Sequence, residues 1–308
     1  MISTKEKYID LMERALSAYS EQHIHRYLED VKRDGLKEHG FPRLTANIGN
    51  LIAHGRALSL KKVFLEMMDL CCRSIPACHA GNGFSVREVF NCISELENSM
   101  AVDAADIARW KGYLAKIDPN VCYEIYATTP TDRVKNWALF AGVSEYFRKE
   151  MGLGGSDEWI DTQLASQLQW LDENGMYMDG EGKVHHPLTY DLVSRALLAM
   201  LLHGGYIGVH YSAINSALRR AGLATLMMQS PNGETPFGGR SNQFVHNEAW
   251  LAVVLEYEAN RYWKGGDRAL AIRFKSAAYR AIGSCERWLE SDPIYHVKNR
   301  FSTESRYG

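Results

Sequence analysis

Residues 131–155, TDRVKNWALFAGVSEYFRKEMGLGG, carry the pattern that decides the fold. Their apolar side chains recur largely at spacings of three and four residues, at Val134, Trp137, Ala138, Ala141, Tyr146 and Phe147. Such spacing places the side chains on one face of an α-helix. Thr131 and Asp132 suit the start of that helix, and the glycines from 152 to 155 suit its end. The stretch therefore predicts one amphipathic helix.

The same spacing recurs along most of the chain. It predicts further helices around Tyr8 to Tyr19 and at 58–72, 86–96, 103–117, 157–171, 187–202, 211–228, 247–262 and 268–289. No useful alternating strand pattern appears before Tyr295. Hairpins of amphipathic helices bury their apolar faces only against neighbouring hairpins. We therefore expect an all-α fold, a complete or incomplete (α/α)5–6 toroid of antiparallel helical hairpins.

The alternative to a toroid is an open helical solenoid, but no fixed repeat with a shared consensus is visible. We predict a single toroid domain over residues 1–308. Its N-terminal hairpins occupy 1–125, and hairpins that carry the candidate site occupy 126–292. Residues 293–308 are polar and are expected to be either a truncated end or a lead into a further segment.

Composition argues against several kinds of partner. The formal net charge is -2 and charged residues make up 23% of the chain. A near-neutral surface gives no electrostatic reason to expect nucleic acid or an anionic membrane as a partner. The N-terminus has no apolar signal-peptide core, and no apolar run reaches the ~20 residues of a membrane span. We expect a cytoplasmic protein, and the sequence does not predict its oligomeric state.

The six cysteines predict neither a metal site nor a disulfide framework. Cys71, Cys72 and Cys78 lie close together beside His79. However, Cys71 and Cys72 point to different faces of a helix, and no second ligand pair follows at zinc spacing. We expect buried free thiols in a reducing compartment, with no metal and no cofactor.

The loop from Asn174 to Tyr190 is the first candidate for chemistry. Its glycines permit tight turns and close approach of the backbone to a ligand. The side chains in it that can transfer a proton or donate a hydrogen bond are Asp179, His185, His186 and Tyr190, which are the candidate catalytic residues. Tyr177 is a candidate for stacking on a sugar ring. The alternative is an ordinary polar surface loop.

A second loop, from Gln229 to Asn247, combines turn residues with candidate substrate-binding side chains. These are Arg240, Asn242, His246 and Asn247, followed by Glu248. Arg240 has a planar guanidinium that suits a carboxylate or sulfate. Asn242 and His246 are four residues apart and are expected to share a helical face. The structural alternatives are that Ser241 caps a helix and that His246 is a core histidine.

Asn136 and Trp137 form a third element, near the start of the helix quoted first. We expect both to reach the same end of the fold as the two loops and to bind substrate. An aromatic face stacks well on a sugar ring because both surfaces are flat and apolar. The alternative for Trp137 is an ordinary core position.

These elements together resemble the helical domain of polysaccharide lyases of the chondroitin and hyaluronate type. The resemblance covers roughly residues 131–250 and rests on three short motifs in the same order: Asn136-Trp137, then Met178-Asp179-Gly180 with His185, His186 and Tyr190, then Gly239-Arg240-Ser241-Asn242. The chain also resembles uncharacterised bacterial and fungal toroid proteins with Asp-Gly and Pro-Phe-Gly-Arg-Ser loops. It departs from the lyases in the short spacing from His186 to Tyr190 and in lacking a second arginine after Arg240.

The resemblance implies action on a uronate-containing oligo- or polysaccharide by β-elimination. It implies that Asn136 helps to neutralise a uronate carboxylate and that Arg240 binds the leaving side. His185 or His186, together with Tyr190, would transfer the protons. A proton next to a carboxylate can be removed only when that charge is neutralised, and the leaving oxygen then needs an acid.

Two other functions fit the same residues. A glycoside hydrolase on an α/α toroid would need a pair of carboxyl groups, which Asp179, Asp191, Glu234 and Glu248 could supply. A non-catalytic glycan-binding or scaffold toroid would have an open, aromatic-lined cleft in which His185, His186 and Tyr190 point apart.

Overall fold

The computed structural model describes residues 4–77, 82–123, 136–181, 184–185, 188–236, 241 and 244–289. These residues form an all-α fold with one two-residue β-hairpin, β1 (Gly180–Glu181) paired antiparallel with β2 (Val184–His185). No helix in this part of the chain is long and apolar enough to cross a membrane. The chain divides into two compact units. The prediction of one toroid domain over residues 1–308 stays a prediction.

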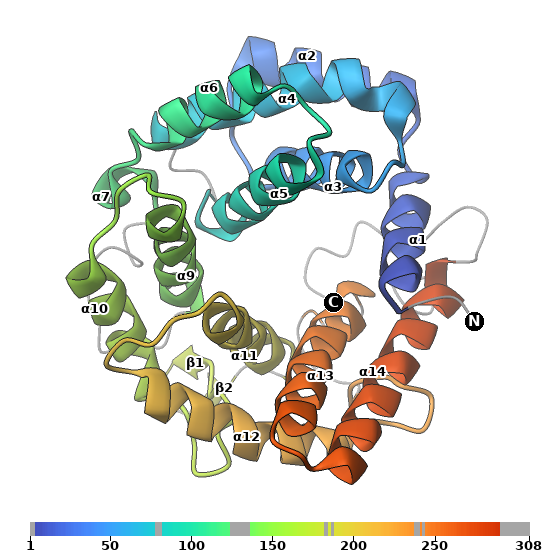
Figure 1. Cartoon of the computed structure of the whole chain (residues 1–308), viewed down its shortest axis with the longest axis vertical. Helices are drawn as coiled ribbons and strands as arrows, with labels where there is room; N and C mark the ends of the chain where they lie inside the picture. The colour runs from blue at the N-terminus through green and yellow to red at the C-terminus, as the bar shows by residue number, and fades with distance from the viewer. Residues whose placement is uncertain are drawn as a thin grey trace. The chain divides into compact units, whose positions relative to one another are not determined.

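The first unit comprises residues 1–11, 131–139 and 164–308. Its complete helices are α11 (Leu188–His203), α12 (Tyr211–Met228), α13 (His246–Lys264) and α14 (Arg268–Leu289). Helices α11 and α13 pack side by side, and α14 packs along α13 (Figure 1). Helix α12 contacts both α11 and α13. The bounds of α12 and α14 confirm the ranges predicted from the apolar spacing.

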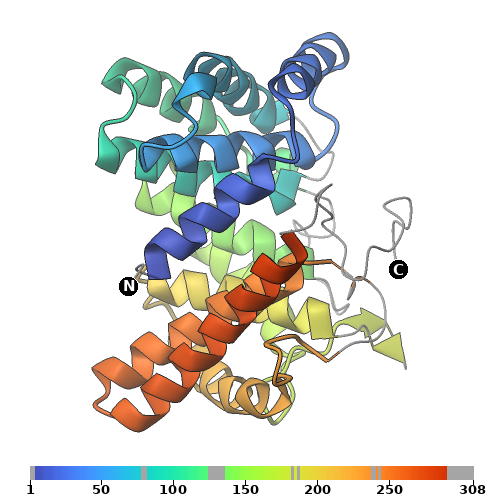
Figure 2. The ribbon, with the colours of Figure 1, turned by 90° about the vertical axis from the view of Figure 1, so that its right-hand side faces the viewer.

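Helices α11 and α12 differ in how much of their surface is buried. Helix α11 is apolar on nearly every side, and most of its residues from Thr189 to Leu201 are buried. Helix α12 buries a single stripe that runs from Ile214 to Thr225. A helix that is apolar all round has neighbours on all sides, whereas a striped helix covers others. Figure 2 shows the same helices turned by 90°.

Alanines bring α13 and α14 close together. The face of α14 toward α13 carries Ala271, Ala277, Ala278 and Ala281, all buried in one cluster with Leu251 and Leu255 of α13. Tyr262 and Phe274 stack across the same interface, with ring centroids 5.3 Å apart. Small side chains on one helix allow larger ones on the other to fill the space without voids.

The second unit comprises residues 12–130 and 140–163. Its complete helices are α2 (Glu21–Asp34), α3 (Gly40–Ala53), α4 (Lys61–Ser74), α5 (Val86–Ser99), α6 (Ala104–Leu114) and the short α7 (Pro119–Cys122). Three 3-10 turns accompany them, at Leu58–Leu60, Ile75–Ala77 and Asn82–Phe84. Helix α3 packs against α4 and α5, while α4 packs against α6. Helices α1 (Thr4–Leu16), α9 (Asn136–Glu150) and α10 (Asp157–Leu168) begin in one unit and end in the other.

The apolar spacing predicted neither the short α7 and the β1–β2 hairpin nor the two longer helices α2 and α3. Helix α2 has a narrow buried stripe of Ile24, Leu28 and Val31 among many charged residues. Helix α3 contains Pro42 in its first turn and Gly49 within it, which are both unusual in a helix. Pro is tolerated there because the first N–H groups of a helix have no partner within the helix.

Five cysteines, Cys71, Cys72, Cys92, Cys122 and Cys285, are free and buried, as predicted. Cys78 lies outside the described residues. Burial raises the pKa of the Cys71 thiol to about 12, although a hydrogen bond with Thr45 opposes the shift. These thiols therefore behave as small apolar core groups.

Gly49 of α3 provides a test of the packing in the second unit. A methyl group added there would come within 2.4 Å of Cys92 Sγ and 2.6 Å of Phe64 Cε2. We expect Gly49→Ala to destabilise the unit by about 1–3 kcal/mol, measured from denaturant unfolding curves, because the core would be overpacked. Gly112→Ala in α6 is the matched control, since nothing lies within 4 Å of the added methyl group. It should stabilise by up to about 1 kcal/mol. Equal midpoints for the two variants would contradict the packing described.

Candidate functional site

The first loop begins with a tight turn from Asp172 to Met176. The Asp172 N–H donates to the Met176 carbonyl at 2.9 Å, and the Gly175 N–H donates to the Asp172 carbonyl at 2.9 Å. The carboxylate of Asp172 closes the turn by accepting from the Met176 N–H at 2.8 Å. An acidic side chain that binds the backbone just ahead of it is a common turn device.

The second loop begins with the same turn, built from Ser230 to Glu234. The Ser230 N–H donates to the Glu234 carbonyl at 3.0 Å, and the Gly233 N–H donates to the Ser230 carbonyl at 2.9 Å. Here the Ser230 hydroxyl takes the place of the carboxylate and accepts from the Glu234 N–H at 3.1 Å. The two loops thus share one turn, followed in each case by the start of a buried helix.

A glycine in each turn lets the loop pack directly on a helix backbone. Gly175 and Gly233 have φ values of 79° and 88°, in the left-handed region that favours glycine. A methyl group on Gly175 would lie 2.1 Å from the Ala217 carbonyl oxygen of α12. The same addition on Gly233 would lie 2.1 Å from the Arg280 carbonyl oxygen of α14. Both glycines are therefore required by conformation and by space.

Two residues after each glycine, the backbone binds a buried carboxylate. The Tyr177 N–H donates to Asp191 Oδ1 at 2.6 Å, and Asp191 lies in the first turn of α11. The Thr235 N–H and hydroxyl both donate to Glu248 Oε1 at 3.2 Å, and Glu248 lies in the first turn of α13. A carboxylate is stabilised at this end of a helix by the partial positive charge of the free N–H groups.

Asp191 also forms an ion pair within α11. The Arg195 Nε donates to Asp191 Oδ1 at 2.8 Å, and its terminal nitrogen donates to Oδ2. Both side chains are buried. Removing two charges from water costs several kcal/mol per ion, so the pair persists only because each group binds the other and Asp191 also accepts from the Tyr177 N–H.

The two loops meet at Ser241. Its hydroxyl lies 3.4 Å from the Tyr190 hydroxyl of α11, and either oxygen can be the donor. Its carbonyl accepts from the Asn247 side chain of α13 at 2.8 Å. Ser241 has a φ of 69°, uncommon for a residue other than glycine. We call Tyr190, Ser241, Phe244, His246 and Asn247 the two-loop site.

The two-loop site has both buried and open parts. Asn247 is fully buried, Tyr190 is half-buried and His246 is exposed. The His246 ring stacks on Phe244, with centroids 5.2 Å apart and planes 12° apart. The arrangement therefore places a phenol, a hydroxyl and an imidazole at one end of two adjacent helices.

Other candidate residues are placed differently from the two-loop site. Tyr177 is buried and its hydroxyl donates to Gln167 Oε1 at 2.6 Å, so we do not include it among sugar-contacting residues. Asp179 and Asn136 are buried, and Trp137 is half-buried at the start of α9. No contact described in the structure tests the expected approach of Asn136 and Trp137 to the loops.

Several candidates cannot be placed. His186, Arg240 and Asn242 lie outside the described residues. The backbone of His185 lies in β2, where it pairs with Gly180, but its side chain is not described. Their roles stay predictions.

The predicted shared helical face of Asn242 and His246 stays a prediction, because Asn242 lies outside the described residues. The structural alternative for Ser241 is wrong. Ser241 is not the cap of that helix, since Val245 precedes its first residue and Ser241 has a left-handed backbone. The helix begins at His246, one residue before the start that the apolar spacing predicted.

Asp191 and Glu248 are the residues whose roles sequence reasoning missed. The sequence suggested Asp191 as a carboxyl group for hydrolysis, and Glu248 as a substrate-binding group or a carboxyl group for hydrolysis. A signal was present in the shared pattern of Asp172-Glu-Asn-Gly-Met-Tyr177 and Ser230-Pro-Asn-Gly-Glu-Thr235. Asn-Gly after a side chain that can accept a hydrogen bond is a strong turn signal. Two such turns ahead of two buried helices indicate a repeated structural unit.

The described residues contain no group of three His, Cys, Asp or Glu side chains that could hold a metal ion. The polar groups of the two-loop site are instead hydroxyl, amide and imidazole groups, which can exchange protons and hydrogen bonds with a polyhydroxylated ligand.

The chain was compared with known proteins. No protein-family model matches it, and no curated protein sequence matches it. Among solved structures, a polysaccharide lyase is similar with a TM-score of 0.50 and 12% sequence identity. The similarity covers 92% of this chain and 97% of that chain. At so low an identity the likeness shows the fold alone.

The Asp191–Arg195 pair leads to a prediction about stability. We expect Asp191→Asn to lower the free energy of unfolding by about 3–5 kcal/mol, because the buried Arg195 would lose its hydrogen-bonded counter-ion. Hydrogen exchange of the Tyr177 amide should accelerate in the same variant, since its acceptor is weakened. Asp30→Asn is the control: its pair with Arg33 is exposed, so the change should be below about 1 kcal/mol. Unchanged stability and exchange in Asp191→Asn would refute this role.

Proposed function

We propose that the chain is a carbohydrate-active enzyme with an α/α toroid of helical hairpins, acting on uronate-containing oligo- or polysaccharides by β-elimination. The observation that carries the proposal is the junction at Ser241, where the Tyr190 hydroxyl and the Asn247 amide of two adjacent helices contact one residue. The likeness of the fold to a polysaccharide lyase supports the same class of function.

The proposed reaction breaks a glycosidic bond without water. A base removes the proton from the carbon next to the uronate carboxylate, and its electron pair forms a double bond to the neighbouring carbon. The bond from that neighbouring carbon to the leaving oxygen breaks, and an acid gives the oxygen a proton. A tyrosine can act first as base and then as acid, because removing the proton regenerates the phenol that donates it.

We assign the proton transfers to Tyr190, with His185 or His186 assisting. The half-buried hydroxyl of Tyr190 has a hydroxyl neighbour at 3.4 Å, which can help to orient it. Asn136 and Arg240 are proposed to neutralise the carboxylate and to bind the leaving side, respectively. Asn247 and Glu248 are positioning residues in this proposal, because their side chains are fully buried and bind the second loop.

Glycoside hydrolysis is the second candidate, and the carboxyl groups argue against it. Asp191 is held by Arg195 and the Tyr177 N–H, and Glu248 accepts two hydrogen bonds from Thr235. Glu234 accepts from Arg287 at 2.9 Å and from Trp288 at 3.3 Å. Three of the four candidate carboxyls therefore bind groups of the protein itself. An inverting or retaining pair needs two carboxyls that face the substrate.

We propose an oligosaccharide as the partner, with no role for nucleic acid or a membrane and with no cofactor. A non-catalytic glycan-binding protein is the remaining alternative. It requires only that sugar binds, so it predicts saturable binding without any change in the sugar.

The test is incubation with a panel of oligosaccharides that contain glucuronate, galacturonate, mannuronate or guluronate. Elimination should produce ultraviolet absorbance from the new double bond beside the carboxylate. We expect Tyr190→Phe to lower the rate by about 10²–10⁴-fold, the usual contribution of a positioned acid or base. His186→Ala should also lower it. Tyr211→Phe, at the exposed start of α12, is the matched control and should leave the rate unchanged.

The alternatives give different results in the same assay. New reducing ends without ultraviolet absorbance would indicate hydrolysis, and binding without either product would indicate a glycan-binding protein. A rate that is equal in wild type, Tyr190→Phe and His186→Ala would remove the catalytic assignment.

A further inference from the structure

A cavity lies in the first unit, away from the two-loop site. Its volume is about 690 Å³, and its walls come from α1, α11, α13 and α14. The apolar part of the wall includes Ala199, Met200, Val253 and Ala271, with Ile272 and Trp263 at the more exposed side. The volume falls within the range of about 300–1,000 Å³ that is usual for small-molecule sites.

The cavity and the two-loop site lie toward opposite ends of the same helices. Tyr190 is in the first turn of α11, whereas Met200 and His203 lie in its last turns. Ten residues separate Tyr190 from Met200, which is about 15 Å along a helix axis. On α13 the two-loop site holds His246 and Asn247, and the cavity begins at Val253. A ligand in the cavity would therefore not occupy the sugar site.

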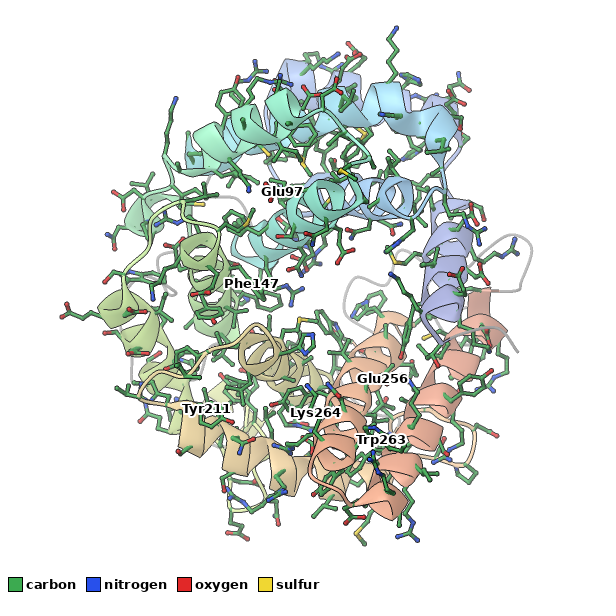
Figure 3. The ribbon with its side chains drawn as sticks, in the orientation of Figure 1. Glu97, Phe147, Tyr211, Glu256, Trp263 and Lys264 are labelled. Atoms are coloured by element: carbon green, nitrogen blue, oxygen red, sulfur yellow. The ribbon has the colours of Figure 1, made fainter. Side chains whose placement is uncertain are left out.

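One wall of the cavity carries a polar cluster around Glu256. The Tyr8 hydroxyl donates to Glu256 Oε1 at 3.1 Å. Lys275 Nζ donates to both carboxylate oxygens, at 2.6 Å and 2.7 Å. Burial and the neighbouring Glu256 raise the pKa of Tyr8, so its hydroxyl stays protonated and remains a donor. Glu256 and Trp263 lie on the same helix, along the side that faces α14 (Figure 3).

The hydrogen bonds that Glu256 already makes determine which ligand group can bind to its carboxylate. Among the described residues, Oε1 accepts from two donors, whereas Oε2 accepts from Lys275 alone. A carboxylate oxygen has two acceptor positions, so Oε2 can take one more donor. Lys275 already balances the charge of Glu256, which favours an uncharged donor over a cation. The rest of the wall offers mainly apolar contact.

We propose that this cavity is a binding site for an uncharged, largely apolar small molecule that carries one hydroxyl group, of the class of aromatic or branched alkyl alcohols. The apolar body would pack between α11, α13 and α14, and the hydroxyl would donate to Glu256 Oε2. The site is independent of the proposed action on uronate sugars, because it uses none of the same residues.

The test compares two probes that differ only in the hydroxyl group, 2-naphthol and naphthalene, by fluorescence titration of the full chain. Both should bind with saturation, and 2-naphthol should bind about tenfold more tightly, as expected for a hydrogen bond to a charged group. Glu256→Leu should abolish that preference and leave naphthalene binding unchanged.

The second part of the test uses variants in which a larger side chain fills the cavity. Val253→Trp should lower the affinity for both probes by at least about tenfold, because the indole would occupy the space of the ligand. Met227→Trp is the control, since Met227 is 88% exposed on α12 and does not line the cavity. Ile272→Trp, at a position that is 59% exposed, fills the cavity from its open side and serves if Val253→Trp does not fold.

Each result decides the proposal. Saturable binding that is lost in the filled variants supports the site, and loss of the hydroxyl preference in Glu256→Leu supports the ligand class. Binding that persists unchanged in both filled variants, or an absence of binding by wild type, overturns the site. Equal affinity for the two probes in wild type overturns the ligand class.

Discussion

The first unit depends on a carboxylate that is buried in the first turn of a helix and receives the N–H of an incoming loop. Asp191 plays this part at α11 and Glu248 at α13. A buried carboxylate without partners would cost several kcal/mol, so each one requires its loop to be in place. The helix ends favour the negative charge, which lowers that penalty. The start of each helix and the path of each loop are therefore determined together.

Two glycines allow each turn to pack closely against a neighbouring helix. Gly175 and Gly233 press the two turns against the backbones of α12 and α14, at positions where a single methyl group would overlap a carbonyl oxygen. Each loop is thus held between a covering helix and the first turn of a buried one. Ser241 and Tyr190 then contact each other as a consequence of two loops that are each fixed separately.

Apolar spacing predicted most of the helices, and α12 and α14 to the residue, because a buried stripe is a local property of the sequence. Helices α2 and α3 were missed because charged residues or Pro and Gly obscure their stripes. The turns at the start of the two loops could be predicted, since Gly, Asn and Pro indicate turns locally. The roles of Asp191 and Tyr177 were not predictable in the same way. An acid that binds an N–H fourteen residues earlier looks, in the sequence, like an acid that faces a substrate.

Two chains can share a fold at 12% identity because the features that determine its helices and turns are local and tolerate many substitutions. Helical stripes and turns can be written with many residues, so the architecture persists while nearly every side chain changes. Catalytic groups have no such freedom, because a proton must pass between particular atoms. The likeness to a lyase shows the fold and does not carry the reaction. At the junction of the two loops this chain presents Tyr190 beside Ser241, while the nearby carboxylates Asp191 and Glu248 bind the loops. With Asp191, Glu234 and Glu248 bound by groups of the protein and the Tyr190 phenol at the junction, we propose proton transfer by Tyr190, and therefore elimination rather than hydrolysis.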